Sequence, residues 1–200
     1  MVPVTAHTKR PLGLAVFLVV AAAIGFAAAF ALTLDKFALL ENPEAQLSCN
    51  FSVLIGCSTN LSSAQGAVFG FPNPLIGLAG WSILGTIGAA ILGGARLSRW
   101  FWIFTNLGVA AALALVIWLI TQSIFVLDVL CPWCMVTWAV TIASFWAVTL
   151  YNLKSGRIPA PASVRKAAAN AYSWIVVITL ASYLVVAVIA QLQMDFLHRL

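Results

Sequence analysis

Apolar residues in this chain gather into five long runs, separated by short polar connections and by one long connection between the first two runs. The runs cover residues 12–34, 74–95, 101–121, 134–153 and 172–192. A helix needs roughly 20 apolar residues to cross about 30 Å of hydrocarbon, and each run meets or approaches that length. The pattern predicts an all-α integral membrane protein. It would form one membrane domain over residues 1–200: a four-helix transmembrane bundle plus a fifth transmembrane helix.

Composition supports the same class. The chain is 63% hydrophobic and 8% charged, whereas an ordinary soluble domain is about 45–50% apolar and about 25% charged. The net charge of +5 does not predict nucleic-acid binding, because the basic residues flank the apolar runs and form no patch with interleaved aromatic residues. Membrane lipid is therefore the expected surrounding, and no nucleic-acid partner is expected.

The basic residues also predict an orientation. Eight of the ten Lys and Arg residues fall before the first run, between the second and third runs, or in the connection 154–171. Five crossings place these three segments on one face, and Lys and Arg concentrate on the cytoplasmic side of membranes. All five acidic residues fall on the other face. We expect a cytoplasmic N-terminus, a cytoplasmic loop 154–171 and an extracytoplasmic loop 35–73.

The extracytoplasmic loop 35–73 is long enough to carry structure of its own. Ser62 begins a weak capping-box pattern, and Leu61, Ala64 and Val68 fall on one face of a helix that would follow. We predict a short surface helix there, with this apolar face over the bundle. The alternative is an irregular loop that touches lipid.

Four cysteines fall on the predicted outer face: Cys49, Cys57, Cys131 and Cys134. The last two form a Cys-Pro-Trp-Cys motif directly before the fourth apolar run. Two sulfurs three residues apart can close a small disulfide ring, and the unpaired N–H groups of a helix start stabilise a thiolate. A thiolate is the form that attacks disulfides, so the motif indicates redox chemistry.

Three alternatives use the same cysteines. Two static disulfides would explain the count, but a local Cys-X-X-Cys ring closes too short a loop to add much stability. A four-sulfur zinc site usually has short spacings on both sides, and the first spacing here is eight residues, so we predict no metal. A membrane assembly or transport protein with structural disulfides is the third alternative. Transporters usually carry ionisable groups within their spans, and the five runs contain no charged residue.

The order of these residues resembles the vitamin K epoxide reductase family, in its bacterial disulfide-forming branch. The similarity covers roughly residues 10 to 153. It is carried by Cys49, Cys57, Ser62-Ser63, Phe69-Gly70, Asn73 with Gly77, and Cys131-Pro132-Trp133-Cys134. The resemblance implies a quinone-dependent thiol–disulfide oxidoreductase in a bacterial inner membrane, with menaquinone or ubiquinone as the quinone.

The resemblance also implies a role for each cysteine. Cys134 corresponds to the cysteine beside the quinone, and Cys131 to its partner, which is attacked from the loop. Cys57 corresponds to the shuttle cysteine nearer the bundle. Cys49 corresponds to the outer shuttle cysteine that meets the substrate protein. Electrons would pass from the Cys49–Cys57 pair to the Cys131–Cys134 pair and then to the quinone.

Quinone contacts are the least specific part of the resemblance. Ser63 corresponds to a serine near the cysteines, with Ser62 in its place if the register differs by one. Asn73 corresponds to a position that can hydrogen-bond a ring carbonyl, although capping of the following helix is an equal alternative. Apolar candidates around the ring are Trp81, Phe125, Trp133, Met135 and Trp138. For each of these, plain packing is the commoner explanation.

Two departures from the family pattern affect what is expected. Many members carry a tyrosine four residues after the last cysteine, where this chain has Trp138, which puts epoxide reduction and coumarin-type inhibition in doubt. Several bacterial relatives continue into a thioredoxin-like domain, whereas the present sequence ends at Leu200. The expected partner is therefore a separate, exported, DsbA-like thioredoxin-fold protein.

Overall fold

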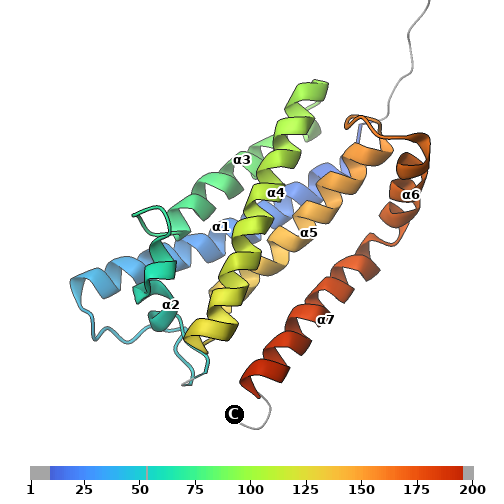
Figure 1. Ribbon diagram of the computed structural model, residues 1–200. Coiled ribbons are helices and arrows are strands. Elements are labelled where there is room, and N and C mark those ends of the chain that lie inside the picture. Colours follow the sequence, from blue (N-terminus) through green and yellow to red (C-terminus); the bar gives the residue numbers. More distant parts are fainter. Residues whose placement is uncertain (1–9, 53, 196–200) are drawn as a thin grey trace, which may run out of the picture.

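Five long apolar helices form the body of the protein in this computed structural model, which describes residues 10–52 and 54–195 (Figure 1). The elements in chain order are α1 (Leu12–Glu41), α2 (Ser58–Ser62), the 3-10 turn η1 (Ala64–Ala67), α3 (Pro74–Leu92), α4 (Arg99–Gln122), the π-helical segment η2 (Ser123–Leu127), α5 (Pro132–Lys154), α6 (Ala162–Ser173) and α7 (Ile175–Met194). The helices α1, α3, α4, α5 and α7 are long and apolar enough to cross a membrane. The predicted all-α membrane architecture is confirmed.

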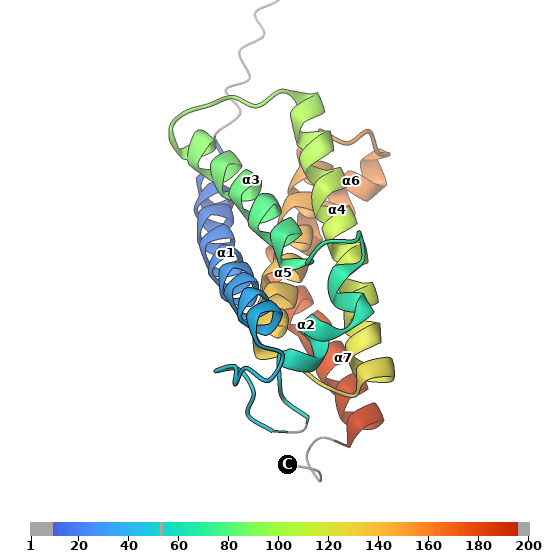
Figure 2. The same cartoon turned by 90° about the vertical axis from the view of Figure 1, so that its left-hand side faces the viewer.

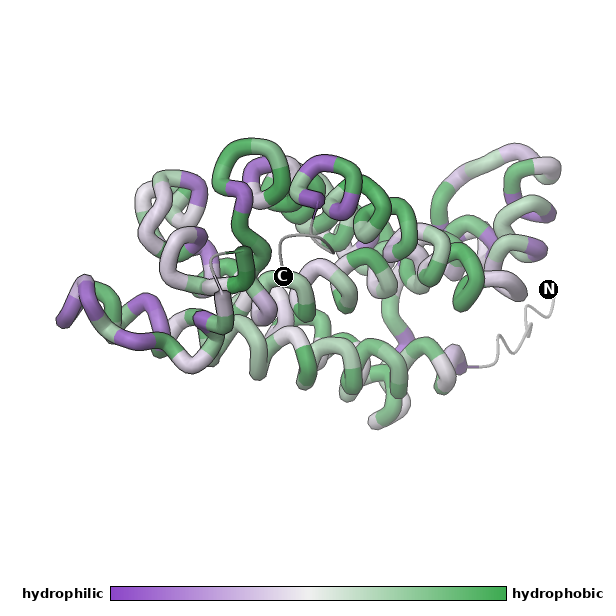
Figure 3. Tube along the Cα trace, turned by 90° about the horizontal axis from the view of Figure 1, so that it is seen from below, coloured by the Kyte–Doolittle hydropathy of each residue, from purple (hydrophilic) through white to green (hydrophobic). Residues whose placement is uncertain are grey.

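The first four long helices form the bundle, and α7 lies along its outside. Helix α1 packs against α3 and α5, α4 packs against α5, and α7 contacts α5 and η2 (Figure 2). Coloured by hydropathy, the long helices are mainly hydrophobic, whereas hydrophilic residues gather at their ends and in the connections (Figure 3). This distribution matches a bundle whose sides face lipid and whose ends face water.

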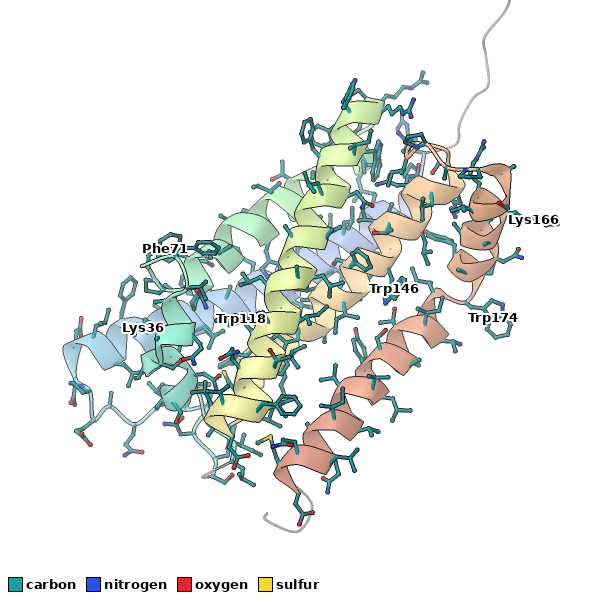
Figure 4. The ribbon with its side chains drawn as sticks, in the orientation of Figure 1. Lys36, Phe71, Trp118, Trp146, Lys166 and Trp174 are labelled. Carbon is teal, nitrogen blue, oxygen red and sulfur yellow. A yellow bond between two sulfur atoms is a disulfide. The ribbon has the colours of Figure 1, made fainter. Side chains whose placement is uncertain are left out.

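The two ends of the bundle differ in charge. One end, here the basic end, carries Arg10, Arg96, Arg99, Lys154 and Arg157. The other, here the cysteine end, carries all four cysteines. Lys36 lies at the cysteine end, and Lys166 lies near the basic end (Figure 4). Lys9 and Arg199, which entered the charge argument, lie outside the described residues. Which end faces the cytoplasm stays a prediction.

Local sequence explains where the helices begin and end. Pro74 and Pro132 occupy the first turns of α3 and α5, where a missing N–H costs nothing. Ser98 caps α4 by accepting a hydrogen bond from the Phe101 backbone N–H. Gly94, with φ +100°, turns the chain after α3 in a conformation that other residues rarely adopt.

Small residues let α1 and α3 approach closely. A Cβ added at Gly25 would lie 2.2 Å from the Trp81 ring, and one at Gly88 would lie 2.9 Å from the Ala15 carbonyl oxygen. Gly80 differs, because a Cβ there would meet nothing within 4 Å. Close packing of small residues is the usual source of helix association in lipid, and here it sets the α1–α3 spacing.

Several predicted boundaries differ from the observed ones. Helix α1 continues past residue 34 to Glu41, since Leu39 is buried and no proline interrupts the helix before Pro43. The connection 154–171 is not a plain loop but contains most of α6, and α7 begins at Ile175 rather than 172. Helix α5 begins at Pro132, and α3 ends at Leu92 before two glycines.

The predicted surface helix is broken into two pieces. Ser63 adopts an extended conformation between α2 and η1, and its side chain, rather than that of Ser62, accepts a hydrogen bond from the Gly66 backbone N–H. The break destroys the expected helical face. Leu61 is buried, but Ala64 and Val68 are exposed, so the predicted apolar face over the bundle is wrong.

The α1–α3 contact predicts a contrast between two glycines of α3. Gly88→Ala should destabilise the protein by about 1–3 kcal/mol, because the new methyl meets a backbone oxygen that cannot move aside. Gly80→Ala should not, since it adds a methyl in open space and a better helix former. Thermal unfolding in detergent measures both. Equal losses would contradict this account of the interface.

Candidate active site

A short backbone pairing joins the connection between α1 and α2 to the segment that precedes α5. Ile55 and Leu130 form an isolated parallel bridge. The Leu130 N–H donates to the Leu54 carbonyl at 2.8 Å, and the Gly56 N–H donates to the Leu130 carbonyl at 3.0 Å. The residues that follow on the two segments, Cys57 and Cys131, are therefore held side by side.

The sulfur atoms confirm this arrangement. Cys49 and Cys57 form a disulfide, while Cys131 and Cys134 are free thiols. Cys57 Sγ lies 3.2 Å from Cys131 Sγ, and both residues are fully buried. The structure therefore does not contain the two static disulfides of the alternative interpretation. One bridge lies in contact with a free thiol, which is the arrangement that disulfide exchange requires.

Polar side chains that sequence reasoning did not single out fix the loop. Asn50 Oδ1 accepts hydrogen bonds from the backbone N–H groups of Cys57 and Ser58. Asn60 Nδ2 donates to the Val129 carbonyl at 3.2 Å. An asparagine in an otherwise apolar stretch could have indicated a side chain that bonds to the backbone. The sequence does not show, however, which backbone groups need such a partner.

The position of Cys131 favours a thiolate. It is the N-cap of α5, and its Sγ accepts a hydrogen bond from the Cys134 N–H at 3.4 Å. Hydrogen bonds from the Cys134 side chain, and from the backbone of Cys134 and Trp133, hold the pKa of Cys131 below its ordinary value. Burial and the negative charge of Asp35 oppose that lowering.

Asp35 lies in contact with the disulfide. Its Oδ2 lies 3.3 Å from Cys49 Sγ, and this carboxylate and the two bridged sulfurs lie within 4.8 Å of one another. Three such groups can suggest a metal site. Two of them are here the sulfurs of a disulfide, which offers no thiolate to a metal.

A cavity of about 730 Å³ opens beside Cys134. It lies between α3 and α4, which make little contact with each other, and α5 forms its inner wall. The wall residues on α5 are Cys134, Thr137, Trp138, Thr141 and Ser144. Because Cys134 and Ser144 are ten residues apart, the cavity extends about 15 Å along the helix.

The cavity includes some of the predicted quinone contacts and not others. Ser63, Asn73, Trp81 and Trp138 line it. The predicted contacts that do not line it are Trp133, Met135 and Phe125. On α5 the reason is helical geometry, since Trp133 and Met135 each lie about 100° around the helix from Cys134. Whether any lining residue binds a quinone stays a prediction.

Asn73 does not cap α3. Its side-chain amide donates to the Gln65 carbonyl at 2.7 Å, and its Oδ1 accepts from the Val68 N–H at 3.0 Å. These bonds fold η1 back over the start of α3 and place the amide at the edge of the cavity. The capping alternative is wrong for the side chain, and the amide retains one N–H that these bonds do not use.

Three further polar side chains in the cavity were missed by sequence reasoning. Gln65 Nε2 donates to Gln122 Oε1 at 3.3 Å across the cysteine end of the cavity. Ser144 is 1% exposed, and its Oγ has no hydrogen-bond partner among the described residues. An otherwise apolar cavity with a few polar groups is typical of a site for a small, mainly apolar ligand.

Comparison with known families settles the class. A profile described as the vitamin K epoxide reductase family matches residues 16–149. The chain belongs to the vitamin K epoxide reductase family. Among curated proteins, none matches it. The matched segment runs from α1 into α5 and contains all four cysteines and most of the cavity wall, whereas α6 and α7 lie beyond it.

Family membership and the disulfide together identify an oxidoreductase of the thiol–disulfide type. The resemblance predicted from the ordered cysteines is confirmed at the level of the family. The match identifies the family, and it does not identify the bacterial branch, the electron acceptor or the thiol partner.

The hydrogen bond from Cys134 to Cys131 predicts a pH difference between two variants. In Cys134→Ser and Cys134→Ala, Cys131 can attack Cys57 across 3.2 Å and form a mixed disulfide, releasing Cys49. Serine keeps a donor to the Cys131 thiolate and alanine does not. The pKa of Cys131 is therefore higher in the alanine variant, and mixed-disulfide formation should begin at higher pH. Acid quenching, maleimide labelling and peptide mass measure it; coincident pH profiles would contradict the role of this hydrogen bond.

Proposed function

We propose that this protein is a quinone-dependent thiol–disulfide oxidoreductase that re-oxidises an exported thioredoxin-fold protein. One observation supports the proposal above the others. Cys131 contacts the loop disulfide through Cys57, while Cys134, three residues on, lines an apolar cavity. The same pair of thiols thus faces a disulfide on one side and a ligand-sized space on the other.

The relay follows from these contacts. A thiolate of the partner protein attacks Cys49, the Cys49–Cys57 bond breaks, and the electron pair leaves on Cys57. Cys57 then attacks Cys131 in an oxidised Cys131–Cys134 pair and releases Cys134 as a thiolate. Cys49, freed when the partner's second thiol resolves the first mixed disulfide, attacks Cys57 and releases Cys131. Two electrons have then moved from the partner to the inner pair.

The described state corresponds to the end of that sequence. The loop bridge is closed, and the two inner cysteines are reduced. The hydrogen bonds to Cys131 Sγ stabilise the thiolate that leaves Cys57. The next step is oxidation of the Cys131–Cys134 pair from the cavity side.

The cavity fits a quinone ring with the first part of its tail. Its volume lies within the range of small-molecule sites, about 300–1,000 Å³, and amides of Asn73, Gln65 and Gln122 stand at the end nearest the relay. A bound quinone would supply the two-electron acceptor. Trp138 and Leu119 would cover the ring, and the amides would donate hydrogen bonds to its carbonyl oxygens.

The location of the protein is part of the same proposal. The basic end would face the cytoplasm by the rule that Lys and Arg collect there, which places the cysteine end outside a bacterial inner membrane. Disulfides form and persist on that side. Cys49 is only 3% exposed, so the segment between α1 and α2 must move to admit the partner.

Two electron donors test the order of the relay. Cys131→Ser and Cys134→Ser should abolish quinone reduction whether the donor is a reduced thioredoxin-fold protein or dithiothreitol. Cys49→Ala should abolish it with the protein donor and largely preserve it with dithiothreitol. Absorbance of the quinone in purified protein measures each rate.

Ser48→Ala, at the exposed neighbour of Cys49, is the matched control and should remain active with both donors. Full activity of both inner-pair variants would refute the relay. Equal loss of both activities in Cys49→Ala would refute the outer position of Cys49.

A further inference from the structure

Asp35 occupies a position that the relay described above does not use. It lies on α1 beyond the predicted end of the first span, and the continuation of that helix to Glu41 brings its carboxylate to the disulfide. Its Oδ2 lies 3.3 Å from Cys49 Sγ. A disulfide sulfur carries no proton, so this is a contact without a hydrogen bond in the described state. Once Cys49 is reduced, its thiol has an acceptor already in place.

No other group competes for this carboxylate. Within residues 10–52 and 54–195, no basic group forms an ion pair with the Asp35 carboxylate, and no group other than Cys49 lies at hydrogen-bond distance from it. The adjacent Lys36 directs its ammonium to the Leu61 carbonyl at 2.7 Å, and so ties α1 to α2 rather than neutralising Asp35. Asp35 is half-buried, which leaves it a path to water.

We propose that Asp35 is the proton acceptor for Cys49 in the step that closes the loop disulfide. Cys49 transfers its thiol proton to the Asp35 carboxylate, and its sulfur attacks Cys57 in the Cys57–Cys131 mixed disulfide. The Cys49–Cys57 bond forms, the Cys57–Cys131 bond breaks, and the electron pair leaves on Cys131 as a thiolate. Asp35 then loses the proton to water. This inference rests on the proposed function only for the order of the relay.

The need for a base at Cys49 follows from the chemistry. A free thiol ionises near pH 8.5, so only about 3% of it is thiolate at pH 7. Cys131 is the N-cap of α5 and is stabilised there as a thiolate, whereas Cys49 lies in an irregular segment and is not itself the N-cap of a helix. Among the residues that the structure describes, the Asp35 carboxylate is the side-chain acceptor in contact with this sulfur.

The opposite role makes an opposite prediction. A carboxylate that acted only through its negative charge would disfavour a thiolate at Cys49, and its removal would speed the step. The other ionisable groups on the segments at this end of the bundle are Cys131 and Cys134 at the start of α5, Lys36 on α1, Glu44 between α1 and the disulfide, and Asp128 after η2. Substitution of Asp35 by Asn also removes the charge that raises the pKa of Cys131, which favours the leaving thiolate and would speed the step. A slower step therefore identifies the carboxylate as the proton acceptor.

The experiment follows one turnover of the full chain. Protein with all four cysteines reduced is mixed with ubiquinone-1, quenched in acid over time, labelled with maleimide and analysed by peptide mass. Oxidation of Cys131 and Cys134 is the first event, the Cys57–Cys131 species the second, and the Cys49–Cys57 bridge the third. Absence of the first event in the unaltered chain would defeat the proposed function, separately from the role of Asp35.

Asp35→Asn should slow conversion of the mixed disulfide into the Cys49–Cys57 bridge by about 10- to 30-fold at pH 7, the upper value being set by the 3% thiolate. The difference should vanish above about pH 9, where the thiol ionises unaided. Asp35→Glu should restore part of the rate. Glu41→Gln, which removes an exposed acid from the same helix, should match the unaltered chain, and the first event should be unaffected throughout.

An unchanged or faster conversion in Asp35→Asn at pH 7 would overturn the proposal, as would equal slowing in Glu41→Gln. A second test uses the unaltered chain and so does not depend on whether a variant folds. Its conversion rate should stay nearly constant from pH 9 to pH 6. A tenfold fall for each pH unit would mean that Cys49 has no base.

Discussion

Two backbone hydrogen bonds between the loop and the start of α5 are the constraint on which the site depends. They pair Leu54 and Gly56 with Leu130, and so set Cys57 against Cys131 at 3.2 Å. The exchange of disulfides requires close approach of an attacking sulfur. A loop of this length would otherwise have many conformations in which the sulfurs do not meet, so the pairing supplies the proximity that the chemistry needs.

The surrounding elements keep that pairing in place. Asn50 and Asn60 satisfy backbone groups of the loop, and Lys36 ties α1 to α2. The π-helical segment η2 ends at Leu127, and the next residue, Asp128, has a φ of 53° that turns the chain toward Leu130. Small residues allow α3 to pack closely against α1, whereas α4 packs against α5. The cavity therefore opens between α3 and α4. Packing of the helices thus determines both the position of Cys131 and the space beside Cys134.

Much of this was predictable from the sequence, for physical reasons. Each membrane crossing needs its own apolar run, and the N-terminal prolines of α3 and α5 mark helix starts. The ordered cysteines also predicted the family. The sequence did not predict that α1 continues to Glu41, because polar residues at the end of an apolar run are equally compatible with a loop. That continuation is what brings Asp35 to Cys49.

Contacts between distant segments were the part that sequence could not supply. Trp133, Met135 and Trp138 are similar candidates as residue types, yet only Trp138 shares the cavity face of α5 with Cys134. Likewise, the Gln65–Gln122 pair joins residues far apart in the chain. Helical periodicity would have favoured Trp138 over its neighbours, but the existence of a cavity depends on the low contact between α3 and α4, which no local pattern reveals.

The most direct test of the account is an anaerobic titration of the chain in its described state, with the loop bridge closed and the inner pair reduced. One equivalent of ubiquinone-1 is added, the quinol is measured by absorbance, and the free thiols are counted by maleimide labelling. The account predicts one quinol per chain, a new Cys131–Cys134 disulfide and an intact Cys49–Cys57 bridge. Quinone that stays oxidised, or quinol that forms while Cys131 and Cys134 remain free thiols, would contradict it.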